Sequence, residues 1–146
     1  MCWSDLHGWF LTTTLMAGCA VVSRSPGSQK PSYQERDEAA KAACRLLWQR
    51  EPLAQEYEYC GTLYWDGTGI RIGFPETNRK ATGCWPSDPP EATELLARYH
   101  SHRINAEPSR EDRALALKYP ELGHYLCSPS GVVRRFSAEE GTVIVR

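Results

Sequence analysis

Apolar side chains near the start of the folded part of the chain recur at the spacing of an α-helix. The pattern runs from Ala39 to Trp48, and Pro52 ends it. Because one apolar stripe at this period is typical of a helix packed on a core, residues 35–50 are predicted to form one amphipathic helix.

The next apolar segment has the character of a β-hairpin. Residues 58–65 are rich in aromatic and apolar side chains and lead into Asp66-Gly67, which is a tight-turn signal. Apolar and other positions alternate in residues 70–74, which are therefore predicted to form the partner strand.

The rest of the chain alternates between short apolar runs and polar connections. The pattern predicts a long loop at 75–90, a buried strand at 94–102, a loop at 103–108 and a helix at 109–118. Three short strands are predicted to follow at 123–128, 131–136 and 142–145. Helices and strands in this order predict an α/β (α+β) fold, with a mixed β-sheet flanked by helices.

Length and charge restrict the function classes. A chain of 146 residues is expected to form one domain with a tail. Its 17 Lys and Arg and 18 Asp and Glu give a net charge of −1, which argues against binding to nucleic acid through phosphate neutralisation. No apolar run approaches the ~20 residues that cross a bilayer.

The first residues differ in composition from the remainder. Residues 8–20 are mostly apolar and small, and the segment ends in Leu15-Met16-Ala17-Gly18-Cys19, which resembles a bacterial lipobox. We therefore predict a signal peptide at 1–18, lipidation of Cys19, a flexible tether at 19–34 and a folded domain at 35–146.

This interpretation places the protein in the cell envelope on the periplasmic side, with membrane contact only through the lipid at Cys19. A signal peptide normally opens with basic residues, and none precedes Arg24. The alternative is therefore a cytoplasmic protein whose Ala-Gly-Cys is coincidental.

Export would place the remaining cysteines in an oxidising compartment. Once Cys2 is removed and Cys19 is acylated, three disulfide pairings remain open for Cys44, Cys60, Cys84 and Cys127. We expect Cys84, in the long loop, to be bonded, and Cys60, inside a strand, to be free.

The sharpest chemical feature is His100-Ser101-His102 at the end of the buried strand. Alternate residues of a strand share a face, so both imidazoles can bind one ion. Asp112, in the first turn of the next predicted helix, is a candidate third ligand. Two histidines, one carboxylate and an open position are typical of catalytic zinc, which also requires a carboxylate base outside the ligand set.

Each of these residues also has a simpler interpretation. Taken alone, the two histidines fit an exposed strand surface better, and Ser109 with Asp112 fits a helix capping box better. Glu58 can be a solvated residue at the start of its strand. Cys60 is expected to be a small buried hydrophobe, and His124 a surface residue.

Taken together, these residues resemble the JAB/MPN metalloprotease family and its JAMM zinc signature. The resemblance lies in Glu58-x-Cys-Gly-x-Leu63, Tyr99-His-Ser-His102 and Pro108-Ser-x-x-Asp112, and it covers residues 35–146. It implies a layered, cytidine-deaminase-like fold. Six residues separate His102 from Ser109 where the family usually has seven, a difference that a surface loop is expected to absorb.

The resemblance implies a zinc-dependent amide-bond hydrolase, a peptidase or isopeptidase. His100, His102 and Asp112 would hold Zn²⁺, Glu58 would activate the zinc-bound water, and Ser109 would stabilise the oxyanion. The substrate would be a peptide, a protein tail or a cell-wall peptide. The alternative is a non-catalytic, lipid-anchored binding or immunity module with the same fold. A zinc deaminase is disfavoured because the chain lacks a Pro-Cys-x-x-Cys ligand pair.

Overall fold

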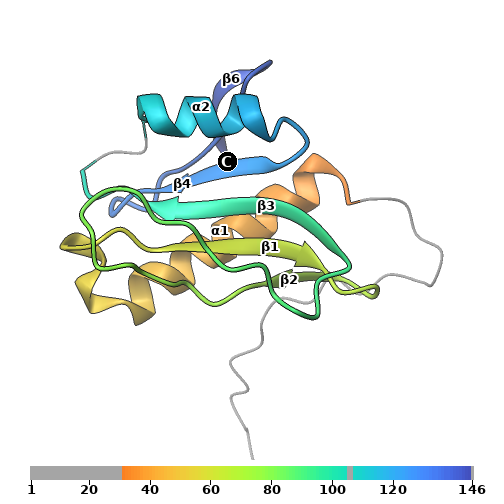
Figure 1. The fold of residues 1–146 in the computed structure, drawn as a ribbon, viewed down its shortest axis with the longest axis horizontal. Helices are drawn as coiled ribbons and strands as arrows, with labels where there is room; N and C mark the ends of the chain where they lie inside the picture. Colours follow the sequence, from red (N-terminus) through yellow and green to blue (C-terminus); the bar gives the residue numbers. More distant parts are fainter. Residues whose placement is uncertain (1–30, 105–106, 146) are drawn as a thin grey trace, which may run out of the picture.

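A computed structural model describes residues 31–104 and 107–145 of the chain. Two α-helices, one short 3₁₀ helix and six strands make up these ranges (Figure 1). In chain order the elements are α1 (Tyr33–Arg50), η1 (Pro52–Gln55), β1 (Cys60–Trp65), β2 (Ile70–Ile72), β3 (Glu94–Ser101), α2 (Arg110–Lys118), β4 (Gly123–Cys127), β5 (Val133–Ser137) and β6 (Gly141–Val145).

The strands form one mixed sheet in the order β2-β1-β3-β4-β5-β6. β3 and β4 are parallel, and every other neighbouring pair is antiparallel. A parallel pair needs a connection that returns the chain to the same end of the sheet, and α2 lies within that connection. The predicted α+β class and the mixed sheet flanked by helices are thus confirmed.

The two faces of the sheet are covered by different parts of the chain. Figure 1 shows α1 behind the strands, and the segment between β2 and β3 in front of β1 and β3. The main core lies between the sheet and α1, where Leu63, Tyr99 and Tyr125 are almost completely buried. A smaller cluster of Ala116, Leu126 and Phe136 lies between α2 and the sheet.

Capping and an apolar stripe explain where α1 forms. Ser32 and Glu35 form a capping box at its start, and the helix buries Ala40, Ala43 and Leu47 against the sheet. The helix begins at Tyr33, within the stretch predicted as tether, because the cap lies before the first apolar repeat. The predicted signal peptide, Cys19 and the tether up to residue 30 lie outside the described residues.

A glycine sets the packing of β1 on β3. Gly61 pairs with Tyr99, and a Cβ atom at position 61 would overlap the Tyr99 ring. The Tyr99 hydroxyl continues past Gly61 and donates a hydrogen bond to the Gly73 carbonyl at 2.8 Å. The absence of a side chain at Gly61 therefore lets a buried tyrosine connect β3 to the segment after β2.

Two disulfides link the layers. Cys44 on α1 is bonded to Cys127 on β4, and Cys60 on β1 is bonded to Cys84 in the segment between β2 and β3. The expectation that Cys84 is bonded is confirmed, whereas the expectation that Cys60 is free is wrong. Cys60 lies on the face of the sheet opposite α1, where the long loop crosses β1 and brings Cys84 within bonding distance.

None of the helices in the described ranges has the length and apolar character needed to cross a bilayer.

The disulfide between α1 and β4 should contribute more to stability than the one at the loop. It joins residues 83 positions apart, against 24 for Cys60–Cys84, and a longer closed loop restricts the unfolded chain more. On the chain-entropy account, the Cys44→Ala/Cys127→Ala variant should lose about 4–5 kcal/mol of unfolding free energy, and the Cys60→Ala/Cys84→Ala variant about 3–4 kcal/mol.

Urea unfolding of both double variants measures the difference, and non-reducing peptide mapping of the wild-type chain checks the pairing. Free thiols at these four cysteines in protein purified under oxidising conditions would contradict it.

Candidate metal centre

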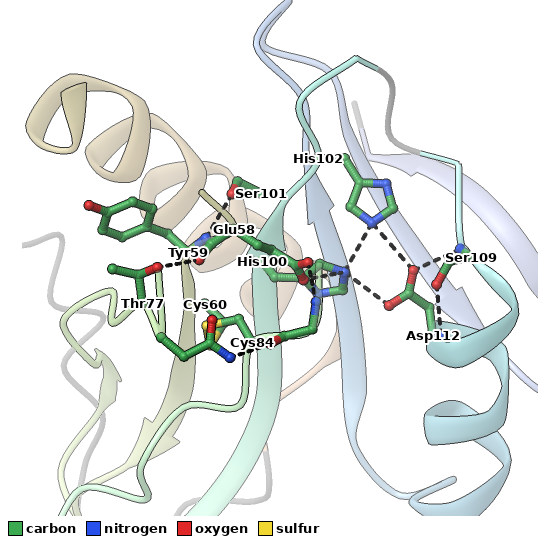
Figure 2. A network of polar contacts seen from close by, with 12 residues as sticks. Glu58, Tyr59, Cys60, Thr77, Cys84, His100, Ser101, His102, Ser109 and Asp112 are labelled. Atoms are coloured by element: carbon green, nitrogen blue, oxygen red, sulfur yellow. Dashed lines mark hydrogen bonds and ion pairs between the residues drawn. A yellow bond between two sulfur atoms is a disulfide. The ribbon is translucent and has the colours of Figure 1, made fainter. Parts of the chain in front are cut away.

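The candidate ligands meet where β3 ends and α2 begins. His100 is the penultimate residue of β3, and His102 follows the strand, where its backbone N–H still donates to the Cys127 carbonyl at 3.0 Å. Asp112 is the third residue of α2 and points back towards both rings (Figure 2). The backbone of β3 and the first turn of α2 therefore position all three side chains.

Short distances separate the three side chains. His100 Nε2 lies 3.2 Å from His102 Nε2 and 3.0 Å from Asp112 Oδ1, while His102 Nε2 lies 3.3 Å from Asp112 Oδ2. The three side chains are only 9–19% exposed. The structure thus brings together all three predicted ligands in a group that could hold a metal ion.

The spacing fits a small tetrahedral cation. Ligand bonds of about 2.0–2.1 Å at the tetrahedral angle place neighbouring donor atoms about 3.3 Å apart, which matches the observed 3.0–3.3 Å. If both Nε2 atoms donated hydrogens to Asp112, two hydrogen-bearing nitrogens would lie within 3.2 Å of each other, whereas a cation lets both nitrogens present lone pairs to it.

Asp112 has two tasks in this arrangement. Its backbone N–H donates to Ser109 Oγ at 3.1 Å, and its Oδ2 accepts from the Ser109 N–H at 2.7 Å, so the predicted capping box is present. The same carboxylate faces both histidines. Burial by itself raises the pKa of Asp112, but the contacts with His100 and His102 outweigh it and hold the pKa below its ordinary value.

Glu58 reaches the centre from a different strand. It precedes β1, and its Oε1 lies 3.8 Å from His100 Nε2. Its Oε2 accepts a hydrogen bond from the Gly83 backbone N–H at 2.7 Å, and its side chain is 13% exposed. One oxygen is therefore anchored to the loop and the other faces the histidines, so Glu58 is a partly buried residue of the site.

The anchoring of Glu58 by the long loop was not among the features predicted from the sequence. Gly83 is followed by Cys84, whose disulfide to Cys60 fixes this part of the loop to β1 (Figure 2). Thr77 also donates to the Glu58 carbonyl at 2.7 Å. The cysteines could have indicated this loop. Cys60 lies two residues after Glu58, so its disulfide to Cys84 brings the loop close to the glutamate.

A cleft of about 630 Å³ opens over the three candidate ligands, a volume in the range of small-molecule sites. Its lining includes Glu58, Ser109, Trp85, Arg98 and His124. The expectation that His124 is a surface residue is wrong, because it is 5% exposed. It lies on β4 beneath α2, where its Nε2 is 3.3 Å from the Tyr119 carbonyl.

Comparison with known proteins identifies no relative: no family model, curated protein or solved structure matches this chain.

We predict that the full chain binds one zinc ion per molecule, and that native mass spectrometry after zinc loading detects it. His102→Ala should abolish binding because two donors hold zinc poorly. Ser109→Ala should keep the zinc while losing about 1 kcal/mol of stability, since it removes the cap and no ligand.

Asp112→Asn is the matched control that separates the two tasks. Its side-chain oxygen still accepts from the Ser109 N–H, so the helix start should remain intact, but without the negative charge the zinc affinity should fall. Unchanged zinc binding in both His102→Ala and Asp112→Asn would contradict this metal centre.

His124 should make the metal-free protein sensitive to acid. Burial lowers the pKa of His124 below its ordinary value of 6.5. As the pH falls through 6.5, the unfolded chain therefore binds a proton that the folded chain does not, and stability is lost. His124→Gln keeps an N–H donor for Tyr119 but does not titrate. Between pH 7.5 and 5.5, urea unfolding should show a smaller loss of unfolding free energy in this variant than in the wild-type protein. Equal losses in the two proteins would contradict the role of His124.

Proposed function

We propose that this protein is a zinc-dependent amide-bond hydrolase, a peptidase or isopeptidase of the JAB/MPN (JAMM) type. The observation that carries the proposal is the combination of three donor atoms at tetrahedral spacing with a separately anchored carboxylate, Glu58, beside them. A structural zinc site closes all four positions with protein ligands, whereas two histidines and one aspartate leave one position open.

The chemistry needs a Lewis acid, a base and a donor for developing negative charge. A zinc ion held by His100, His102 and Asp112 would supply the Lewis acid, which lowers the pKa of water and polarises a substrate carbonyl. The other two groups come from the chain itself.

Glu58 is the candidate base. The Gly83 N–H holds its Oε2, so its Oε1 stays directed towards His100. In this position Oε1 can take a proton from the attacking water and later deliver it to the departing amine. The anchored geometry supports this role because the carboxylate need not change its rotamer between the two transfers.

Ser109 is the candidate donor to the substrate oxygen. Its Oγ accepts the Asp112 N–H at 3.1 Å, which orients the hydroxyl and leaves its hydrogen for another acceptor. Because Ser109 lines the cleft, that hydrogen can be donated to a carbonyl oxygen as negative charge develops on it.

The proposed substrate is a peptide, a protein tail or a cell-wall peptide, and the proposed location is the cell envelope, with a lipid at Cys19 as the only membrane contact. Two disulfides support an oxidising compartment, because such bonds are rare in reducing cytosol. The net charge of −1 gives no support to a nucleic-acid substrate.

Glu58→Gln tests the proposal. Glutamine keeps an oxygen for the Gly83 N–H but cannot accept a proton, so zinc content and melting temperature should stay close to wild type. Turnover should fall by about 10²–10⁴-fold, the usual contribution of a general base. The substrate is first found by screening peptides and cell-wall fragments with zinc-loaded wild-type protein.

Glu56→Gln is the matched control, because Glu56 is an exposed carboxylate two positions before Glu58 in the chain, and this variant should retain activity. Full activity in Glu58→Gln together with loss in His102→Ala would remove Glu58 from the mechanism. Full activity in both would contradict a zinc hydrolase.

A further inference from the structure

A buried arginine lies beside the candidate metal centre. Arg98 is two residues before His100 on β3, so the strand places both side chains on the same face of the sheet, and both line the cleft. The Arg98 side chain is only 12% exposed. A positive charge has thus been largely removed from water next to the proposed reaction site.

Aromatic rings cover the guanidinium. Its central carbon lies 3.6 Å from the centroid of the Trp85 ring and 5.4 Å from that of Tyr119. These rings come from the long loop and from the end of α2. Stacking of this kind stabilises the cation and holds the plane of the guanidinium, but it provides no hydrogen-bond acceptor in that plane.

Most nitrogen atoms of the Arg98 guanidinium donate no hydrogen bond to the described residues. Its Nε and Nη1 atoms are buried and have no hydrogen-bond partner among the described residues. Its Nη2 lies 3.5 Å from Asp88 Oδ1, at the outer limit of a hydrogen bond, and the Asp88 side chain is 64% exposed. A buried charge is normally paired and hydrogen-bonded, so this guanidinium has capacity for a further anionic partner.

Asp88 indicates which partner fits. A carboxylate carried by an exposed loop residue already lies against Nη2, so this nitrogen can be approached from the solvent side by a group of that chemistry. An incoming carboxylate can replace Asp88 at Nη2.

We propose that Arg98 forms a carboxylate-binding subsite, and that the substrates of this protein carry a carboxylate close to the amide that is cleaved. This inference rests on the proposed function for its link to cleavage, but the subsite itself does not require the metal. The carboxylate has two sources in a peptide, an acidic side chain or the free chain terminus. Asp88 is its intramolecular competitor.

Three N-acetylated dipeptides serve as probes with the metal-free full chain, so that a carboxylate cannot bind zinc instead. Acetyl-Ala-Glu-amide offers a side-chain carboxylate, acetyl-Ala-Ala with a free carboxyl end offers a terminal one, and acetyl-Ala-Gln-amide is neutral. At least one acidic probe should bind about tenfold or more tightly than the neutral probe in calorimetric or NMR titrations, as expected for a charge-assisted hydrogen bond. The stronger acidic probe identifies the source.

Variants assign the preference to Arg98. Arg98→Gln should remove the preference for acidic probes. Arg98→Lys should retain part of this preference, because lysine keeps the positive charge but lacks the planar guanidinium. Asp88→Asn should strengthen acidic-probe binding several-fold by removing the competitor. Arg103→Gln, which removes the same charge from an exposed residue of the same cleft, should leave the preference unchanged.

Equal binding of acidic and neutral probes by wild-type protein would overturn the subsite, and so would a preference that survives in Arg98→Gln or disappears in Arg103→Gln. Asp88→Asn carries an exposed substitution and tests the subsite even if the Arg98 variants fail to fold. If the metal-free chain shows the Arg98-dependent preference but no zinc-loaded hydrolysis is found, the subsite stands and the proposed function fails. If the zinc-loaded protein hydrolyses a substrate but the metal-free chain does not prefer the acidic probes, the proposed function stands and the subsite fails.

Discussion

The pairing of β1 with β3 is the constraint on which the candidate site depends. Cys60 pairs with His100, and Gly61 pairs with Tyr99, whose ring occupies the space that a larger residue at position 61 would fill. This register places Glu58, which precedes β1, beside the histidine end of β3. A shift by one residue would turn either Glu58 or His100 to the opposite face.

The parallel pairing of β3 with β4 completes the arrangement from the other side. The chain leaves β3 at the histidines and returns to the start of β4 through α2, so the first turn of α2 begins close to the end of β3. Asp112 therefore reaches His100 and His102 while it caps its own helix through Ser109. The geometry of the candidate ligands is held by capping and strand pairing, which is what a preorganised site requires.

Much of the fold and part of the candidate site were predictable from local patterns in the sequence. Helical spacing located α1 within two residues of its start, and the alternation of β3 correctly predicted that His100 and His102 would lie together. The Ser109–Asp112 spacing predicted both a cap and a candidate ligand. These features depend on residues that are close in sequence, where the periods of helices and strands determine which side chains share a face.

Contacts between distant segments were not predictable in the same way. The partner of Cys60, the burial of His124 and the surroundings of Arg98 all depend on which parts of the chain cover the face of the sheet opposite α1. That cover is an irregular segment between β2 and β3 together with α2, and neither has a periodic signal that fixes its position over the strands. The anchoring of Glu58 by Gly83 depends on the same segment.

The central claim is that three side chains, and not Glu58, bind one metal ion. An anomalous difference map at the zinc absorption edge, from crystals of the zinc-loaded protein, tests it most directly. The account predicts one peak between His100 Nε2, His102 Nε2 and Asp112, with Glu58 still accepting the Gly83 N–H and outside bonding distance of the metal. A peak elsewhere, direct coordination by Glu58, or no peak at these three residues would contradict it.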